Sequence, residues 1–147
     1  MSENKSLEGV KIFSRTATGD FVGVARTAYK QASEAKRTFA KITRTNLIGH
    51  SGEPCAFHLR YFEIAPGGFS SYEKHKHIHA VIIERGKGLL VSGEIFYELK
   101  TGDVVYVGSN VPHQFRCEDD ANEPLGFFCI VDAQRDKPVL LPPPDFS

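Results

Sequence analysis

Four of the six histidines have the spacing of a metal site: His75, His77 and His79 in the segment SYEKHKHIHAV, and His113 in NVPHQF. Residues two apart on a β-strand point to the same face, so the first three side chains can converge. Neutral imidazole is a common protein ligand for zinc, iron, manganese, nickel and copper. The pattern predicts one divalent transition metal ion. The alternative is a solvated polar strand end, because lysines alternate with the histidines.

Two further side chains are candidates for chemistry beside such a metal. Cys117 lies four residues after His113, so on one strand both face the same side, and its thiol is either a small core group or a nucleophile. Arg60 alternates with His58 and Phe62, and it would clamp a carboxylate or phosphate if that face points inward. Arg116 and Lys87 are other cations that could contribute to a phosphate site. Cys129, in the apolar run GFFCIV, is expected in the core.

Short strands separated by turns are expected to position these residues. Runs rich in β-branched and aromatic residues cover 57–64, 80–84, 88–91, 95–99, 104–107, 114–117 and 125–131. Glycine-containing turn signals separate most of them at nearly regular intervals. This arrangement favours an antiparallel β-sandwich or barrel.

The segments on either side of these strands differ from them in amino-acid composition. The alanine-rich stretch from Asp20 to about Thr38 predicts a helix, and Lys41 to Gly52 is expected to be connecting structure. Four prolines in DKPVLLPPPDFS rule out a central strand there and predict an extended tail on the surface or at a subunit contact. We therefore expect an N-terminal arm and helix over 1–52 that pack on a barrel over 53–133, followed by a proline-rich tail over 134–147.

The composition excludes several classes of partner. Lysine plus arginine and aspartate plus glutamate number 18 each, so no net charge attracts nucleic acid or an anionic membrane. No apolar run approaches the roughly 20 residues that span a bilayer, and the first residues do not resemble an export signal. Three scattered cysteines suit a reducing compartment. A cytoplasmic protein with a small-molecule substrate is expected.

Residues 67–117 resemble the two sequence motifs of the cupins, G-x5-H-x-H-x3/4-E-x6-G and G-x5-P-x-G-x2-H-x3-N. The positions that match without a gap are Gly67, Glu73, His75, His79 and Gly86 in the first motif, and Gly102, Gly108, Asn110, His113 and Cys117 in the second. The resemblance implies an all-β double-stranded β-helix, the jelly-roll barrel of cupins, here with a short helical N-terminal extension. Gly108 and Asn110 stand where the motif has proline and glycine, and both suit a tight turn.

The first motif leaves the ligand set open between two registers. In the gapless register the resemblance gives Glu73, His75, His79 and His113, and a shift by one pair gives His75, His77, His79 and His113. Glu73 could also be a carboxylate that orients a ligand histidine. His75, His79 and His113 belong to the site in every case.

The segments LRYFEIAPGGFSSYEKHKHIHAVIIERGKG and LGFFCIVDAQRDKP resemble a bacterial group of single-domain cupins that includes 1-methylthio-xylulose-5-phosphate methylsulfurylase. The resemblance implies an enzyme with Mn, Fe, Ni, Zn or Cu that acts on a small oxygenated substrate such as a keto-sugar phosphate. A cupin dioxygenase that consumes O₂, and a non-catalytic metal-containing cupin that binds a small molecule, are the alternatives. Small cupins commonly form homodimers, which is therefore expected here.

Overall fold

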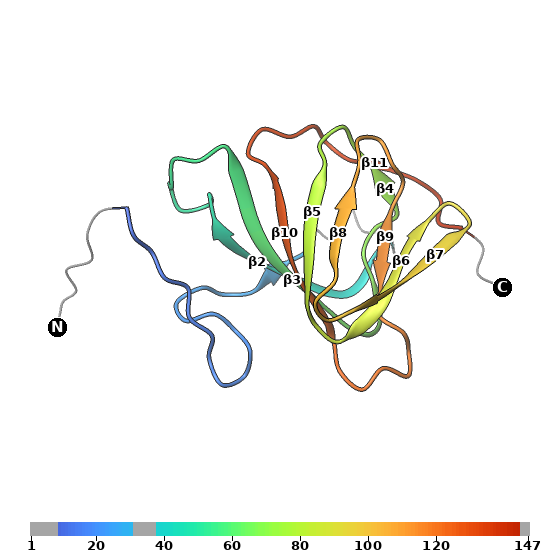
Figure 1. The fold of residues 1–147 in the computed structure, drawn as a ribbon, viewed down its shortest axis with the longest axis horizontal. Helices are drawn as coiled ribbons and strands as arrows, with labels where there is room; N and C mark the ends of the chain where they lie inside the picture. The colour runs from blue at the N-terminus through green and yellow to red at the C-terminus, as the bar shows by residue number, and fades with distance from the viewer. Residues whose placement is uncertain (1–8, 31–37, 145–147) are drawn as a thin grey trace.

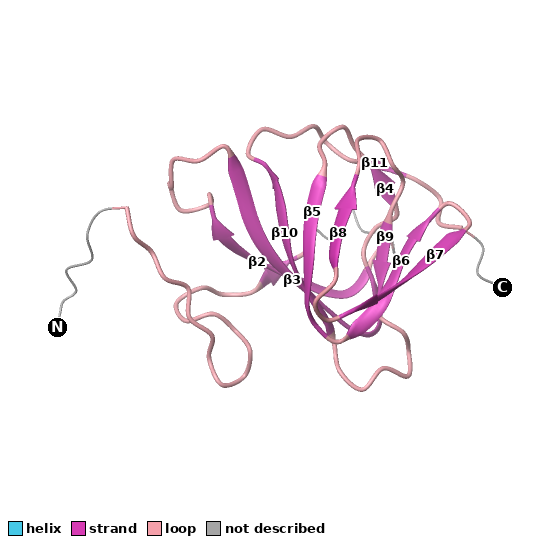
Figure 2. Cartoon of the chain, viewed as in Figure 1, coloured by secondary structure: helices cyan, strands magenta, loops and turns pink. Residues whose placement is uncertain are grey.

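Strands are the only regular elements in the part of the chain that the structure describes, residues 9–30 and 38–144 of a computed structural model (Figure 2). They are β1 (Thr27–Ala28), β2 (Ala40–Ile48), β3 (Phe57–Phe69), β4 (Glu73–Lys74), β5 (His79–Arg85), β6 (Lys87–Ser92), β7 (Ile95–Lys100), β8 (Val104–Val107), β9 (Gln114–Arg116), β10 (Leu125–Asp132) and β11 (Val139–Leu140). Over the described ranges, no helix has the length and apolarity needed to cross a membrane.

One curled antiparallel sheet forms the barrel. Its strands follow the order β7-β6-β9-β3-β10-β5-β8, and β2 also pairs with β3. The 13-residue strand β3 pairs with β2 and β10 along most of its length, and its last residue, Phe69, pairs with Arg116 of β9. Figure 1 shows the result, with β2, β3 and β10 on one side and β9, β6 and β7 on the other. The predicted antiparallel β-barrel is confirmed.

The alternation of side chains along β5 and β10 separates the interior from the surface. In β5, His79, Val81 and Ile83 are buried, whereas Ile82 between the last two and Glu84 after them are exposed. In β10, the side chains of Phe127, Cys129 and Val131 alternate inward in the same way and join the core. Because His79 shares the inner face of the strand with core residues, its imidazole points into the barrel.

Two turns require unusual backbone angles, and both were expected to be turns. Gly86, between β5 and β6, has a φ of 73°, and a Cβ atom there would lie 2.2 Å from the carbonyl oxygen of Pro124. Asn110, before His113, has a φ of 60°, which asparagine tolerates better than most residues. The tight turn that carries His113 into the barrel is therefore compatible with asparagine at this motif position.

The predicted N-terminal helix does not form over residues 20–30, and residues 31–37 of its span lie outside the described residues. Gly23 has a φ of 76°, and β1 pairs with β2. Phe21 is buried against Tyr61 and Phe128, with ring centroids 5.7 and 6.2 Å away. Tertiary packing of this aromatic side chain outweighs the helix propensity of the alanines.

Two other flanking segments also join the β structure. Residues 40–48, expected as part of a connection, form β2 along the edge of β3. The proline-rich tail runs along the surface as expected, but it contains β11, which pairs antiparallel with β4 through Val139–Lys74 and Leu140–Glu73. This pairing holds the C-terminal segment against the histidine-bearing part of the chain.

Candidate metal centre and adjoining pocket

The three histidines that both registers of the first motif have in common lie in separate parts of the barrel. His75 directly follows β4, His79 begins β5, and His113 directly precedes β9. Glu73 and His113 form a bridge in which each backbone N–H donates to the other's carbonyl oxygen, at 3.1 and 2.9 Å. This backbone pairing brings the two motifs together, although about 40 residues separate them in the sequence.

His75, His79 and His113 form a compact buried cluster. One potential ligand atom from each ring lies within 4.8 Å of the others. The Nε2 atoms of His75 and His79 are 2.8 Å apart. The ring centroid of His113 lies 4.9 Å from that of His75 and 5.0 Å from that of His79. The prediction that these three side chains converge is confirmed, and their metal binding is considered below.

In each of the three rings, the Nδ1 atom lies within hydrogen-bond distance of a partner. His75 Nδ1 lies 2.7 Å from the carbonyl oxygen of His77, and His113 Nδ1 lies 2.9 Å from that of Val111. His79 Nδ1 lies 2.9 Å from the Cys129 sulfur. Since a carbonyl oxygen can only accept, Nδ1 carries the proton in His75 and His113, and the Nε2 lone pair is free. Converging imidazole lone pairs repel one another unless a cation lies between them, so this donor set fits a divalent transition metal.

Burial keeps these imidazoles neutral. It is the largest cause that lowers the pKa of His75, to about 4, and the charge of His113 adds to the effect. Burial also lowers the pKa of His79 well below its usual value, and it lowers that of His113. Because neutral imidazole is the form that binds metals, all three rings are ready to act as ligands near pH 7.

Glu73 and His77, the alternatives for a fourth ligand, differ in placement. Glu73 Oε2 lies 3.8 Å from His75 Nε2, and its Oε1 accepts a hydrogen bond of 2.6 Å from Lys30 Nζ. His77 stacks on His75, with ring centroids 3.6 Å apart and planes 3° from parallel. Its Nδ1 lies 2.9 Å from Asp136 Oδ1. Glu73 thus presents an oxygen toward the ligand nitrogen of His75, whereas Asp136 holds one nitrogen of His77.

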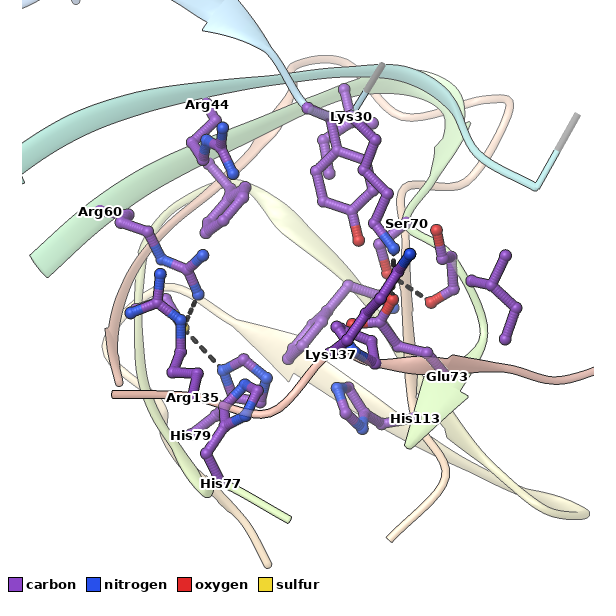
Figure 3. A pocket seen from close by; sticks show the side chains of 18 of the residues that line it. Lys30, Arg44, Arg60, Ser70, Glu73, His77, His79, His113, Arg135 and Lys137 are labelled. Atoms are coloured by element: carbon purple, nitrogen blue, oxygen red, sulfur yellow. Dashed lines mark hydrogen bonds and ion pairs between the residues drawn. The ribbon is translucent and has the colours of Figure 1, made fainter. Parts of the chain in front are cut away.

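The cluster opens onto a cavity of ≈ 590 Å³. Its cationic lining residues are Lys30, Arg44, Arg60, Arg135 and Lys137, and its aromatic ones are Tyr29, Phe62, Phe115 and Phe127. Figure 3 shows Arg44, Arg60 and Arg135 on one side, with Lys30 and Glu73 on the other and His77, His79 and His113 below. A cavity with cationic and aromatic lining beside these histidines can hold an anionic molecule with one oxygen atom at the histidines.

The structure places Cys117 in the core, which was one of its two predicted roles, and it places Cys129 at the cavity, which was not predicted. Cys117 does not line the cavity: it belongs to the hydrophobic core, and its sulfur lies 3.7 Å from the Glu123 carbonyl oxygen. It shares a strand face with His113, but four residues along a strand amount to about 13 Å, too far for contact. Cys129 does line the cavity, with its sulfur 2.9 Å from His79 Nδ1 and 3.6 Å from Arg60 NH2.

Among the predicted anion-binding cations, Arg60 alone faces the cavity. Arg116 and Lys87 are not among its lining residues. Arg44 and Arg135 line it and were missed, because the first lies in a segment expected to be a connection and the second in the tail. Alternation of Arg44 with Ile42 and Asn46 on one strand face was the only signal in the sequence.

Comparison with known proteins supports the fold and the motifs. Residues 60–131 match the sequence model of the Cupin domain. The 1-methylthio-D-xylulose 5-phosphate methylsulfurylase of Rhodospirillum rubrum is 42% identical over 118 residues, which cover 80% of this chain and 72% of that protein.

Two solved structures are similar over most of their length. A cupin 2 conserved barrel domain protein from Rhodopseudomonas palustris is 39% identical with a TM-score of 0.76, covering 88% of this chain and 86% of that one. A cupin-2 domain protein from Rhodospirillum rubrum is 37% identical with a TM-score of 0.73, covering 89% and 82%. The curled barrel, the pairing of the two motif segments at Glu73 and His113, and the similarity to these relatives agree. The chain belongs to the cupin family.

Proposed function

We propose that this protein is a metal-dependent enzyme that acts on the carbonyl group of a keto-sugar phosphate. The observation that carries the proposal is the buried cluster of His75, His79 and His113, which opens onto a cavity lined by five cationic side chains. The relative named as a methylsulfurylase acts, by its name, on a sugar phosphate that carries a methylthio group. The same class of substrate suits the charge of this cavity.

In this proposal His75, His79, His113 and Glu73 hold one Mn, Fe, Ni, Zn or Cu ion. Such an ion would supply a Lewis acid for the carbonyl oxygen of the substrate. Glu73 is preferred over His77 as the fourth ligand because its Oε2 already faces His75 Nε2, and because Lys30 leaves that oxygen free by binding the other one. His77 then supports the cluster by stacking on His75, and Asp136 anchors its ring.

The remaining side chains of the cavity provide the surroundings of the reaction. Cys129 accepts the Nδ1–H of His79 and so orients that ligand, while its sulfur also faces the cavity. Phe62, Phe115 and Phe127 form an apolar wall that limits water around the substrate. The ion pair of 2.6 Å with Lys30 Nζ fixes the position of the Glu73 carboxyl group beside the histidines.

Elemental analysis of the purified protein, combined with a substrate assay, tests the proposal. We expect about one metal equivalent per chain, as for one cluster of ligands, and release of the methylthio group from 1-methylthio-D-xylulose 5-phosphate. His113→Ala should lose both metal and turnover. The matched control is His50→Ala, which removes an exposed histidine that lies outside the cluster.

Three outcomes would contradict the proposal. A protein that takes up no metal after reloading lacks the metal centre. Metal-dependent O₂ consumption without release of a methylthio group would indicate a dioxygenase. Full metal occupancy with no turnover of keto-sugar phosphates would leave a cupin that binds a small molecule without catalysis.

A further inference from the structure

Three arginines from distant parts of the chain meet at one side of the cavity (Figure 3). Arg44 comes from β2, Arg60 from β3, and Arg135 from the segment after β10. Their charges act on one another: after burial, the charge of Arg60 is the next cause that lowers the pKa of Arg44 and of Arg135. Folding has therefore brought like charges together, which is unfavourable unless an opposite charge joins them.

Within the described residues, no carboxylate forms an ion pair with any of these three guanidinium groups. Arg60 is 9% exposed; it contacts the Cys129 sulfur at 3.6 Å and lies over the Phe62 ring, 5.0 Å from its centroid. Arg135 NH1 donates to the Asp132 carbonyl oxygen at 2.7 Å and lies 2.9 Å from His58 Nδ1. These contacts orient the arginines but do not neutralise them.

Two of the donors have no protein partner at all. The Nε atoms of Arg44 and Arg60 are buried and make no hydrogen bond. Other arginines of the same molecule are paired: Arg26 contacts Glu63 at 2.8 Å and Arg85 contacts Glu63 at 3.1 Å. A buried donor without a partner costs about 1–3 kcal/mol, and more when it is charged. The three arginines therefore need an external anion to balance their charge and to accept their unpaired hydrogen bonds.

We infer that Arg44, Arg60 and Arg135 form the binding site for the phosphate monoester group of the substrate. This inference rests on the proposed function and assigns the two ends of that substrate to two places in the cavity. A planar guanidinium donates two parallel hydrogen bonds to phosphate oxygens, and three of them match a dianion better than lysines would. The aromatic face of Phe62 beneath Arg60 keeps that guanidinium in place.

The arginine site lies very close to the cluster of His75, His79 and His113. The Cys129 sulfur is 2.9 Å from His79 Nδ1 and 3.6 Å from Arg60 NH2, so a single sulfur atom separates a ligand histidine from the arginines. Arg60 and Cys129 are also directly paired across β3 and β10. A substrate that reaches both sites is therefore short, with its phosphate only a few bonds from the oxygen at the histidines. Long phosphorylated molecules would have to leave one site empty.

Titration calorimetry with inorganic phosphate tests the site without knowledge of the substrate. We use the full-length protein both as purified and after treatment with a chelator, since the arginines should bind phosphate with or without metal. Arg44→Gln and Arg135→Gln should each weaken phosphate binding by about tenfold or more, the expected loss for one hydrogen bond between charged groups. Lys87→Gln removes an exposed cation outside the cavity and is the matched control. Arg60→Gln is less suitable because the side chain is buried and the variant can fail to fold.

The outcomes separate this inference from the proposed function. If phosphate binding disappears after chelation, phosphate binds the metal and the arginine site is wrong. If Lys87→Gln weakens binding as much as Arg44→Gln, the attraction is unspecific and the site is wrong as well. If the protein holds no metal and turns nothing over, but the arginine variants still lose phosphate, the proposed function fails while the anion site stands.

Discussion

Protonation of the histidine cluster should make the stability of the metal-free protein depend strongly on pH. His75 has a pKa lowered to about 4 in the folded state, chiefly by burial, and an ordinary value of 6.5 when the chain is unfolded. Between pH 4 and 6.5 the unfolded state therefore binds one more proton at this residue. By linkage, the free energy of unfolding rises with pH across this window, and the stabilisation is lost as the pH falls through it.

The size of the effect follows from the shift. One proton changes the free energy of unfolding by about 1.4 kcal/mol per pH unit, so His75 contributes about 3 kcal/mol over the whole window. No reduction for solvent screening is needed, because the side chain is almost completely buried. The pKa of His79 and His113 is lowered in the same direction, so the slope for the wild type should exceed that for one proton.

Urea unfolding followed by circular dichroism, at several pH values after chelation, measures this slope. His75→Gln should reduce the slope by about 1.4 kcal/mol per pH unit, whatever it does to stability at pH 7. The comparison cancels the contribution of His50, whose pKa is also lowered to about 4, because His75 is not among the groups that shift it. An unchanged slope in His75→Gln would mean that His75 is not held neutral in the folded cluster, and the argument from burial would be wrong. Restoring the metal should extend the slope of the wild-type curve to lower pH, because the ion competes with protons for the same nitrogens and so keeps them unprotonated in the folded state.

Four substitutions test other parts of the structure. Cys129→Ser should weaken metal binding in a chelator competition by about tenfold, because the sulfur orients His79, whereas Cys117→Ser should leave metal affinity unchanged and lower only the urea midpoint. Glu73→Gln should lower metal affinity by about tenfold or more in the same assay, and equal affinity would remove Glu73 from the ligand set. Asp136→Asn should raise KM more than it lowers kcat, because Asp136 receives hydrogen bonds from the backbone of Lys76 and His77 and fixes the segment that carries Arg135; a change in kcat alone would contradict this.

Local sequence patterns were sufficient for the barrel and for the histidines. The parity argument grouped His75, His77 and His79, and the structure brings His75 and His79 together with His113, although β5 begins only at His79. The helix over residues 20–30 failed because propensity counts only local preferences, whereas Phe21 gains its burial from Tyr61 and Phe128, about 40 and 107 residues away. A contact between residues so far apart in the sequence cannot be detected in the local sequence pattern.

The cysteines show the same limit within the site. Face parity correctly grouped Cys117 with His113, but parity says nothing about how far along the strand the metal lies. Cys129 reaches His79 because β10 pairs with both β3 and β5, and that pairing sets Cys129 beside Arg60 and Val81. Strand order is a property of the whole fold, so the sequence of the GFFCIV segment could only suggest a core residue.

The C-terminal segment connects the two halves of the proposed site. Arg135 belongs to the arginine cluster, and Asp136, the next residue, binds the backbone of Lys76 and both backbone and ring of His77. Further along, Leu140 pairs with Glu73 at the metal cluster. A displacement of this segment would therefore move an anion-binding cation, a ring stacked on His75 and the backbone of Glu73 together. Because one short segment positions groups at both ends of a small substrate, binding of the phosphate at Arg135 should also stabilise the arrangement of side chains around the histidines.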